Sequence, residues 1–163
     1  MLKEAKLNLA LQLRDELHLH ESNQLLIKLA EEYPQNAYIH YQCAWSFDRL
    51  GEEAKAVPYY EKAIHGDLAE EDLQNAYLGL GSTFRALGEY EKSRAVLVKA
   101  IEAFPNNEAL RVFYAMTLYN LKEYQSAMEL VLKCIVSTSD VKEIQKYKKA
   151  IEFYSDKLDE AWK

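Results

Sequence analysis

The chain has 163 residues, of which 49% are apolar, and a formal net charge of −6. These values predict one globular unit with a sizeable core, and the negative charge argues against nucleic-acid binding, because phosphate contacts need a basic surface. The low content of five Gly and three Pro excludes a turn-rich β fold and favours helices.

The N-terminal segment lacks the features of a targeting signal. Asn8, Gln12 and Arg14 interrupt the apolar run that a signal peptide or a membrane span requires. We therefore expect a cytoplasmic protein that does not act at a membrane. Cys43 and Cys134 have no Cys or His at ligand spacing, which predicts two buried thiols instead of a disulfide or a metal site.

An internal repeat organises the chain. Small and apolar residues of the third copy, Gly81, Phe84, Ser93, Leu97 and Ala100, recur 34 residues later as Ala115, Leu118, Ala127, Val131 and Cys134. The same set stands 37 residues earlier as Ala44, Phe47, Ala56, Tyr60 and Ala63, and another 34 earlier as Ala10, Leu13, Ser22, Leu26 and Leu29. Four copies are predicted, at 3–36, 37–73, 74–107 and 108–138, within one domain spanning 1–163.

Each copy has the length of two helices of about 13 residues. The small residues, such as Gly81 on the first helix and Ser93 on the second, predict where the two helices approach closely. Pro34 and Pro105 predict the turns that close the first and third copies. Gly51 and Gly88 predict the turns inside the second and third copies.

The segment 140–162 follows a run of capping residues and has an amphipathic helical pattern. We expect one capping helix there, because a stack of repeats leaves an apolar end that must be covered. The alternative is a dimerisation helix, which would make the protein a self-associating structural module. That alternative depends on Trp162, which stands at the extreme end of the helix, where no partner within the chain is evident.

No residue pattern supports catalysis, a metal site or a cofactor. The acidic segment 65–72 lacks the alternating oxygen ligands and central Gly of a calcium loop, and Glu70–Asp72 fit the negative first turn of a helix. A phosphate-binding loop, a nucleophile elbow and a Cys-x-x-Cys pair are all missing from the sequence. We expect a protein that is not an enzyme and binds no cofactor.

The third copy carries a family resemblance. Its residues Tyr77-Leu-Gly-Leu-Gly81, Phe84, Gly88-Glu-Tyr90, Ser93, Leu97, Ala100 and Pro105 resemble the tetratricopeptide repeat (TPR) pattern. The stretch from Ala56 to Tyr124 is similar to a bacterial subgroup, group five, including its three-residue insertion before the third copy. The first copy departs from the pattern, because Lys6 stands where an aromatic residue is usual. The resemblance implies an all-α fold, a right-handed α-α superhelix of four helix pairs followed by the capping helix.

The resemblance also implies that the first helix of each pair lines a concave groove that receives a ligand. Helix periodicity then selects nine groove-facing candidates: Tyr38, Tyr41, Trp45, Arg49, Leu78, Ser82, Arg85, Met116 and Tyr119. Tyr41, Trp45 and Arg85 are the strongest, because aromatic residues and Arg are the usual interface anchors. The alternative for each aromatic residue is that it packs between neighbouring repeats.

The expected ligand is a protein or peptide segment of unidentified source. A carboxylate clamp of the kind found in chaperone-tail binders is disfavoured, because Leu7, Leu11, Gln42, Asn75 and Gly79 occupy its positions. We expect an extended or helical segment with apolar anchors and one acidic group for Arg85 or Arg49. An RNA-binding helical array would share this architecture, but the net charge of −6 argues against it.

Overall fold

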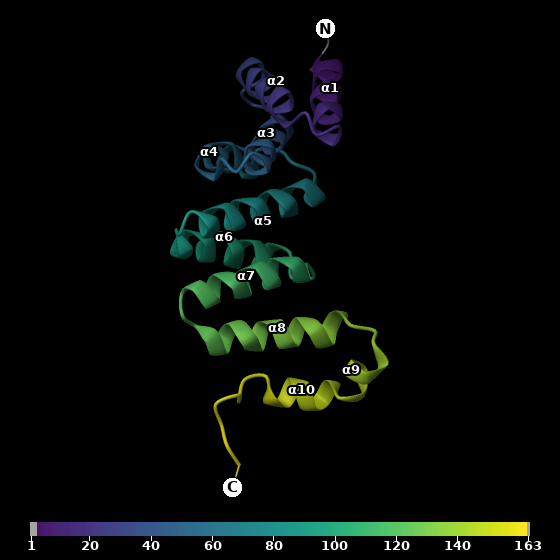
Figure 1. Ribbon diagram of the computed structural model, residues 1–163, viewed down its shortest axis with the longest axis vertical. Coiled ribbons are helices and arrows are strands. Elements are labelled where there is room, and N and C mark those ends of the chain that lie inside the picture. The colour runs from purple at the N-terminus through teal and green to yellow at the C-terminus, as the bar shows by residue number, and fades with distance from the viewer. Residues whose placement is uncertain (1–2, 163) are drawn as a thin grey trace. The chain divides into compact units, whose positions relative to one another are not determined.

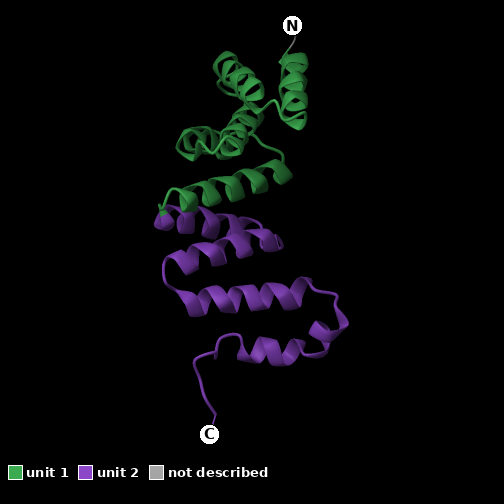
Figure 2. Cartoon of the chain, viewed as in Figure 1, with its two compact units in different colours: residues 1–89 green, residues 90–163 purple. Residues whose placement is uncertain are grey.

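The computed structural model describes residues 3–162, and within this range the chain forms ten helices in sequential pairs (Figure 1). It divides into two compact units, residues 1–89 and 90–163 (Figure 2). The first unit contains α1 (Lys3–Asp15), α2 (Leu19–Glu32), α3 (Ala37–Arg49), α4 (Glu53–Ile64) and α5 (Glu70–Ala86). The second contains α6 (Tyr90–Ala103), α7 (Glu108–Asn120), α8 (Tyr124–Thr138), α9 (Lys142–Lys146) and α10 (Lys148–Tyr154).

The predicted turns are confirmed at their expected places. After Pro34, the side chain of Asn36 caps α3 by accepting a hydrogen bond of 3.0 Å from the backbone N–H of Ile39. After Pro105, Asn107 caps α7 in the same way. Each turn between the two helices of a copy contains one left-handed residue: Leu17, Gly51, Gly88 and Lys122, with φ of 66°, 70°, 76° and 65°. The fourfold recurrence of this turn includes the first copy, whose sequence pattern is the weakest.

The small-residue positions lie where neighbouring helices pack. Ala10 and Ser22 are fully buried, and the Ser22 hydroxyl donates a hydrogen bond of 2.7 Å to the carbonyl of Ala10, which joins α1 to α2. In the first unit α3 contacts α2, α4 and α5, and in the second unit α7 contacts α6 and α8. The closest approach concerns Gly79, where an added Cβ would lie 2.5 Å from the Tyr60 ring. The α4–α5 contact therefore depends on a glycine that the small-residue pattern did not select.

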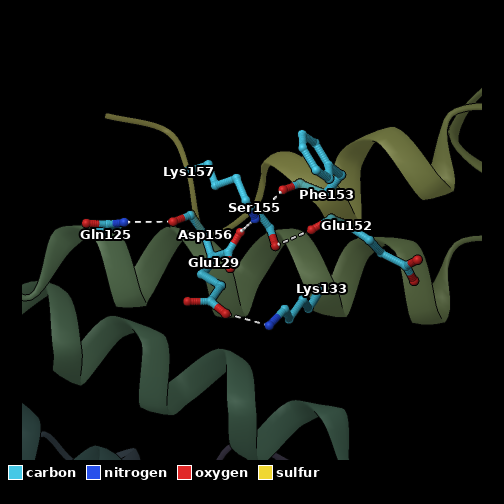
Figure 3. Close-up of polar contacts among 8 residues, drawn as sticks. All are labelled: Gln125, Glu129, Lys133, Glu152, Phe153, Ser155, Asp156 and Lys157. Carbon is cyan, nitrogen blue, oxygen red and sulfur yellow. Dashed lines mark hydrogen bonds and ion pairs between the residues drawn. The ribbon is translucent and has the colours of Figure 1, made fainter. Parts of the chain in front are cut away.

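The prediction of one capping helix over 140–162 is wrong in extent. Helix α9 ends at Lys146, α10 ends at Tyr154, and no helix follows in residues 155–162. At this end of α10, Ser155 Oγ donates to the carbonyl of Glu152 at 2.8 Å and Lys157 Nζ to that of Phe153 at 3.0 Å (Figure 3). The backbone N–H of Lys157 bonds the carbonyl of Tyr154, three residues before it, so the chain makes a turn instead of continuing the α-helix.

The segment nevertheless lies against the last repeat. Helix α10 packs on α8, and Gln125 Nε2 donates a hydrogen bond of 2.9 Å to the carbonyl of Asp156 (Figure 3). Ser155, between them in Figure 3, is fully buried. Both cysteines are buried free thiols, as predicted. Among residues 3–162, no helix is both long and apolar enough to cross a membrane.

Candidate functional site

Three aromatic residues form a stripe along one face of α3, because residues three and four apart on a helix lie side by side. The aromatic stripe comprises Tyr38, Tyr41 and Trp45. The Tyr38 and Tyr41 rings meet edge to face with centroids 6.3 Å apart, and the Tyr41 and Trp45 rings are stacked at 6.4 Å with an interplanar angle of 11°. Trp45 is 37% exposed, which is high for an indole. The stripe therefore presents a tryptophan at the surface on an aromatic support.

Tyr41 belongs to that support. Its side chain is only 7% exposed, and its ring also contacts Tyr60 of α4, with centroids 6.5 Å apart. Burial raises the pKa of the Tyr41 hydroxyl. The prediction that Tyr41 is among the strongest groove contacts thus needs revision, because the residue mainly holds Trp45 and the neighbouring helix in place.

A hydrogen-bonded group behind the stripe joins α3, α4 and α5. Tyr60 donates its hydroxyl to Asp48 Oδ2 at 2.7 Å, and Thr83 donates to Asp48 Oδ1 at 3.1 Å. Burial raises the pKa of Asp48, and these two hydrogen bonds partly oppose that rise. Burial also raises the pKa of Tyr60, and the neighbouring Asp48 carboxylate raises it further. These hydrogen bonds therefore connect α3, which carries the stripe, to α4 and α5.

Arg14, in the last turn of α1, packs on the ring of the tryptophan. Its guanidinium carbon lies 3.9 Å from the centroid of the Trp45 ring, and Nη1 donates a hydrogen bond of 2.7 Å to Gln42 Oε1. The residue is 7% exposed, so this cation–π contact is largely removed from water. Burial lowers the pKa of Arg14, the charge of Asp15 partly opposes this, and the nearby charge of Arg49 lowers the pKa further.

Arg14 is absent from the predicted site, although the sequence contains a signal for it. The residue holds the same place in the first copy as Asp48, Arg85 and Tyr119 hold in the later copies, at spacings of 34, 37 and 34. Helix periodicity makes that place groove-facing in the later copies. The predicted site begins only at the second copy, because the repeat pattern of the first is degenerate.

The remaining candidates of the first unit lie on α3 and α5. Arg49 is exposed at the end of α3. Leu78, Ser82 and Arg85 of α5 are each half-buried. Since α5 contacts α3, the seven candidates of this unit come from two packed helices.

The other two candidates belong to the second unit, and both lie on α7. Met116 and Tyr119 are 40% and 63% exposed. The Tyr119 ring meets that of Tyr124 on α8 edge to face, with centroids 5.1 Å apart. Tyr124 and Met128 of α8 are also about half exposed, and the sequence pattern did not select them because they belong to the second helix of their copy.

The comparisons with known proteins agree with this architecture. The family model described as Tetratrico peptide repeat, of the group numbered five, matches residues 37–158. This range covers the second, third and fourth copies, and the resemblance inferred from their residues is confirmed. Among proteins with curated descriptions, none is a significant match to the chain.

Solved structures share the fold at low sequence identity. YrrB, described as a TPR protein with an unusual peptide-binding site, has a TM-score of 0.74 and 16% identity over 90% of this chain and 74% of its own. A MamA RS-1 ArsTM double mutant has a TM-score of 0.71 and 14% identity, covering 96% of each chain. TTC0263, a thermophilic TPR protein of Thermus thermophilus, has a TM-score of 0.58 and 21% identity over 97% of this chain and 85% of its own. The predicted all-helical fold of TPR type is confirmed.

Proposed function

The chain belongs to the tetratricopeptide repeat family, and from this premise we propose that it is a non-enzymatic module that binds a peptide or protein segment. The segment lies against α3 in the first unit, and its main anchor is Trp45. The observation that carries the proposal is the partly exposed Trp45 ring, which contacts both the Arg14 guanidinium and the Tyr41 ring.

A tryptophan fixed in this way is suited to binding. Interface hot spots are enriched in Trp, Tyr and Arg, and a side chain already held in one rotamer loses little conformational entropy when a ligand covers it. Tyr38 extends the same surface along α3, and it is half-buried. The ligand is therefore a segment with at least one apolar or aromatic side chain that packs on Trp45. The peptide-binding site described for YrrB supports this use of the fold.

The test is selection of random peptides displayed on phage, followed by Trp45→Ala in the full chain. We expect the selected peptides to bind the variant at least about tenfold more weakly, the usual cost of removing a hot-spot tryptophan. Tyr41 stays in place in this test, because it is buried and its loss would disturb the packing of α3 on α4. Fluorescence anisotropy with labelled peptide gives the affinities, and far-ultraviolet circular dichroism verifies the fold.

The matched control is Trp162→Ala, which removes the other tryptophan, 60% exposed and located in the second unit. We expect this variant to keep full affinity. Peptides that bind wild type and Trp45→Ala equally would contradict the proposal.

A further inference from the structure

Arg14 and Arg49 form a pair of cations with no carboxylate partner. The ion pairs formed among residues 3–162 include neither of them. Arg14 makes one hydrogen bond, to the neutral amide of Gln42, and one ring contact, to Trp45. A buried arginine is usually neutralised by an acid, so an uncompensated one beside an exposed tryptophan indicates a missing partner.

We propose that Arg14 and Arg49 bind the carboxylate of an Asp or Glu side chain in the segment that packs on Trp45. This inference depends on the proposed function and adds the chemistry of the ligand to it. The sequence alone places the acidic group at Arg85 or Arg49, whereas the structure adds Arg14 as the principal contact.

The geometry of Arg14 leaves it able to receive a carboxylate. Its guanidinium carbon lies 3.9 Å from the centroid of the Trp45 ring, and a guanidinium carries its N–H donors around the edge of its plane. One donor is used by Gln42. The side chain is 7% exposed, so its other donors keep a small contact with solvent. A carboxylate can therefore form charge-assisted hydrogen bonds with donors of Arg14 that have no partner among the described residues.

The surrounding charges favour a single carboxylate over a more highly charged anion. Asp15 follows Arg14 in the chain, and its negative charge raises the pKa of Arg14. The negative charge of Asp72 raises the pKa of the nearby Tyr41. Asp48 already accepts hydrogen bonds from Tyr60 and Thr83. These acids limit the positive potential around the two arginines, so a phosphate with nearly two charges gains less than one carboxylate does.

The position of Arg14 along α3 indicates an acid inside a segment, not a free C-terminus. Arg14 lies over Trp45, which stands about two turns after Tyr38 and one turn before Arg49, the last residue of α3. A segment that follows α3 over this length has residues on both sides of the acid. The occupant is thus an internal sequence with an apolar residue for Trp45 and an acidic residue adjacent to it.

The test uses peptides fused at their C-terminal end to the phage coat protein, which removes any free carboxylate. The best binder is then synthesised with an acetylated N-terminus and an amidated C-terminus, in a Glu form and a Gln form. We expect the Gln form to bind wild type about tenfold more weakly, since hydrogen bonds to charged groups are the strong ones. Arg49→Ala should reduce that preference to about threefold or less, because Arg49 is exposed and its loss leaves the packing intact.

Two further variants complete the design. Arg14→Lys keeps the charge and removes the planar fork, so it should also reduce the preference for Glu, and a thermal melt verifies that it folds. Lys62→Ala removes an exposed cation from α4, on the second helix of the same copy, and should keep the full preference.

The outcomes separate this inference from the proposed function. Peptides that depend on Trp45 but bind equally in Glu and Gln forms would overturn the inference and leave the proposed function standing. A preference for Glu that survives in both arginine variants would also overturn it. Failure to select any peptide that depends on Trp45 would remove the proposed function, and the inference with it.

Discussion

At the scale of single residues, two turns hold a left-handed conformation without glycine. Leu17 and Lys122 have φ of 66° and 65°, whereas Gly51 and Gly88 fill the equivalent turns of the middle copies. A side chain with a Cβ is destabilised in this conformation by about 1–2 kcal/mol. The outer copies therefore carry a backbone cost that the middle copies avoid.

We expect Leu17→Gly to stabilise the protein by about 0.5–1 kcal/mol, after the larger entropy of glycine in the unfolded chain is subtracted. Leu17 is 72% exposed, so little packing is lost. Urea denaturation followed by circular dichroism measures the change. As a control, Leu87→Gly removes a leucine that precedes Gly88 and has negative φ of −76°, and it should destabilise. Equal losses in both variants would refute the explanation.

The residue scale also shows which parts of the site were predictable. Helix periodicity places Tyr38, Tyr41 and Trp45 on one face of α3, as the sequence indicates. The burial of Tyr41 depends on Tyr60, which reaches it from another helix, and no pattern within α3 reveals that contact. The contact of Arg14 with Trp45 was hidden for a similar reason. It joins the first copy, whose repeat pattern is degenerate, to the second copy, whose pattern is clear.

At the scale of elements, the repeat spacing predicted the helix pairs well because it reflects helix packing and turn chemistry. Asn and Gly at fixed positions start and end the helices through local hydrogen bonds and backbone freedom, so they are readable from the sequence. The C-terminal segment is different. Its helical pattern continues to Trp162, but α10 ends at Tyr154, where the backbone N–H of Lys157 bonds the carbonyl of Tyr154 and the chain turns.

The hydrogen bonds of Asp48, which join α3 to α4 and α5, predict how the stability of the protein depends on pH. Asp48 has a raised pKa because burial disfavours its charged form, so the uncharged form suits the fold better. Its contribution to stability is therefore present below the ordinary value of 3.8 and is lost as the pH rises through the folded pKa. At neutral pH the wild type carries the whole cost of the buried charge.

We expect Asp48→Asn to be more stable than the wild type at neutral pH, because an amide oxygen in the place of Oδ2 can accept from both Tyr60, at 2.7 Å, and Thr83, at 3.2 Å. The advantage should shrink as the pH is lowered through the raised pKa of Asp48 toward the ordinary value of 3.8, because the wild-type carboxyl then becomes protonated. Urea denaturation across this range measures the difference, with Asp67→Asn in the exposed loop before α5 as the control. A difference in stability that does not change with pH would contradict the assignment.

At the scale of the whole molecule, the C-terminal end presents an exposed aromatic surface. Phe153, Tyr154 and Trp162 are 54%, 47% and 60% exposed. Trp162 was predicted to lack partners within the chain, but its ring contacts Tyr154 and Phe153, with centroids 5.4 and 6.4 Å apart. The three rings thus shield part of one another's surface, which weakens the main reason for a dimerisation helix.

The net charge of −6 also opposes association of two identical chains. We expect sedimentation equilibrium at high micromolar concentration and moderate salt to give the mass of a monomer. The reason is that Trp162 already contacts Phe153 and Tyr154 of its own chain. Added salt screens the repulsion between two chains. The experiment is therefore repeated at high salt, which shows whether a monomer results from this repulsion or from the lack of an attractive surface. A dimer at either salt concentration that Trp162→Ala dissociates would establish self-association through the C-terminal segment. The module would then act as a paired structural unit, and each copy would still present its own Trp45.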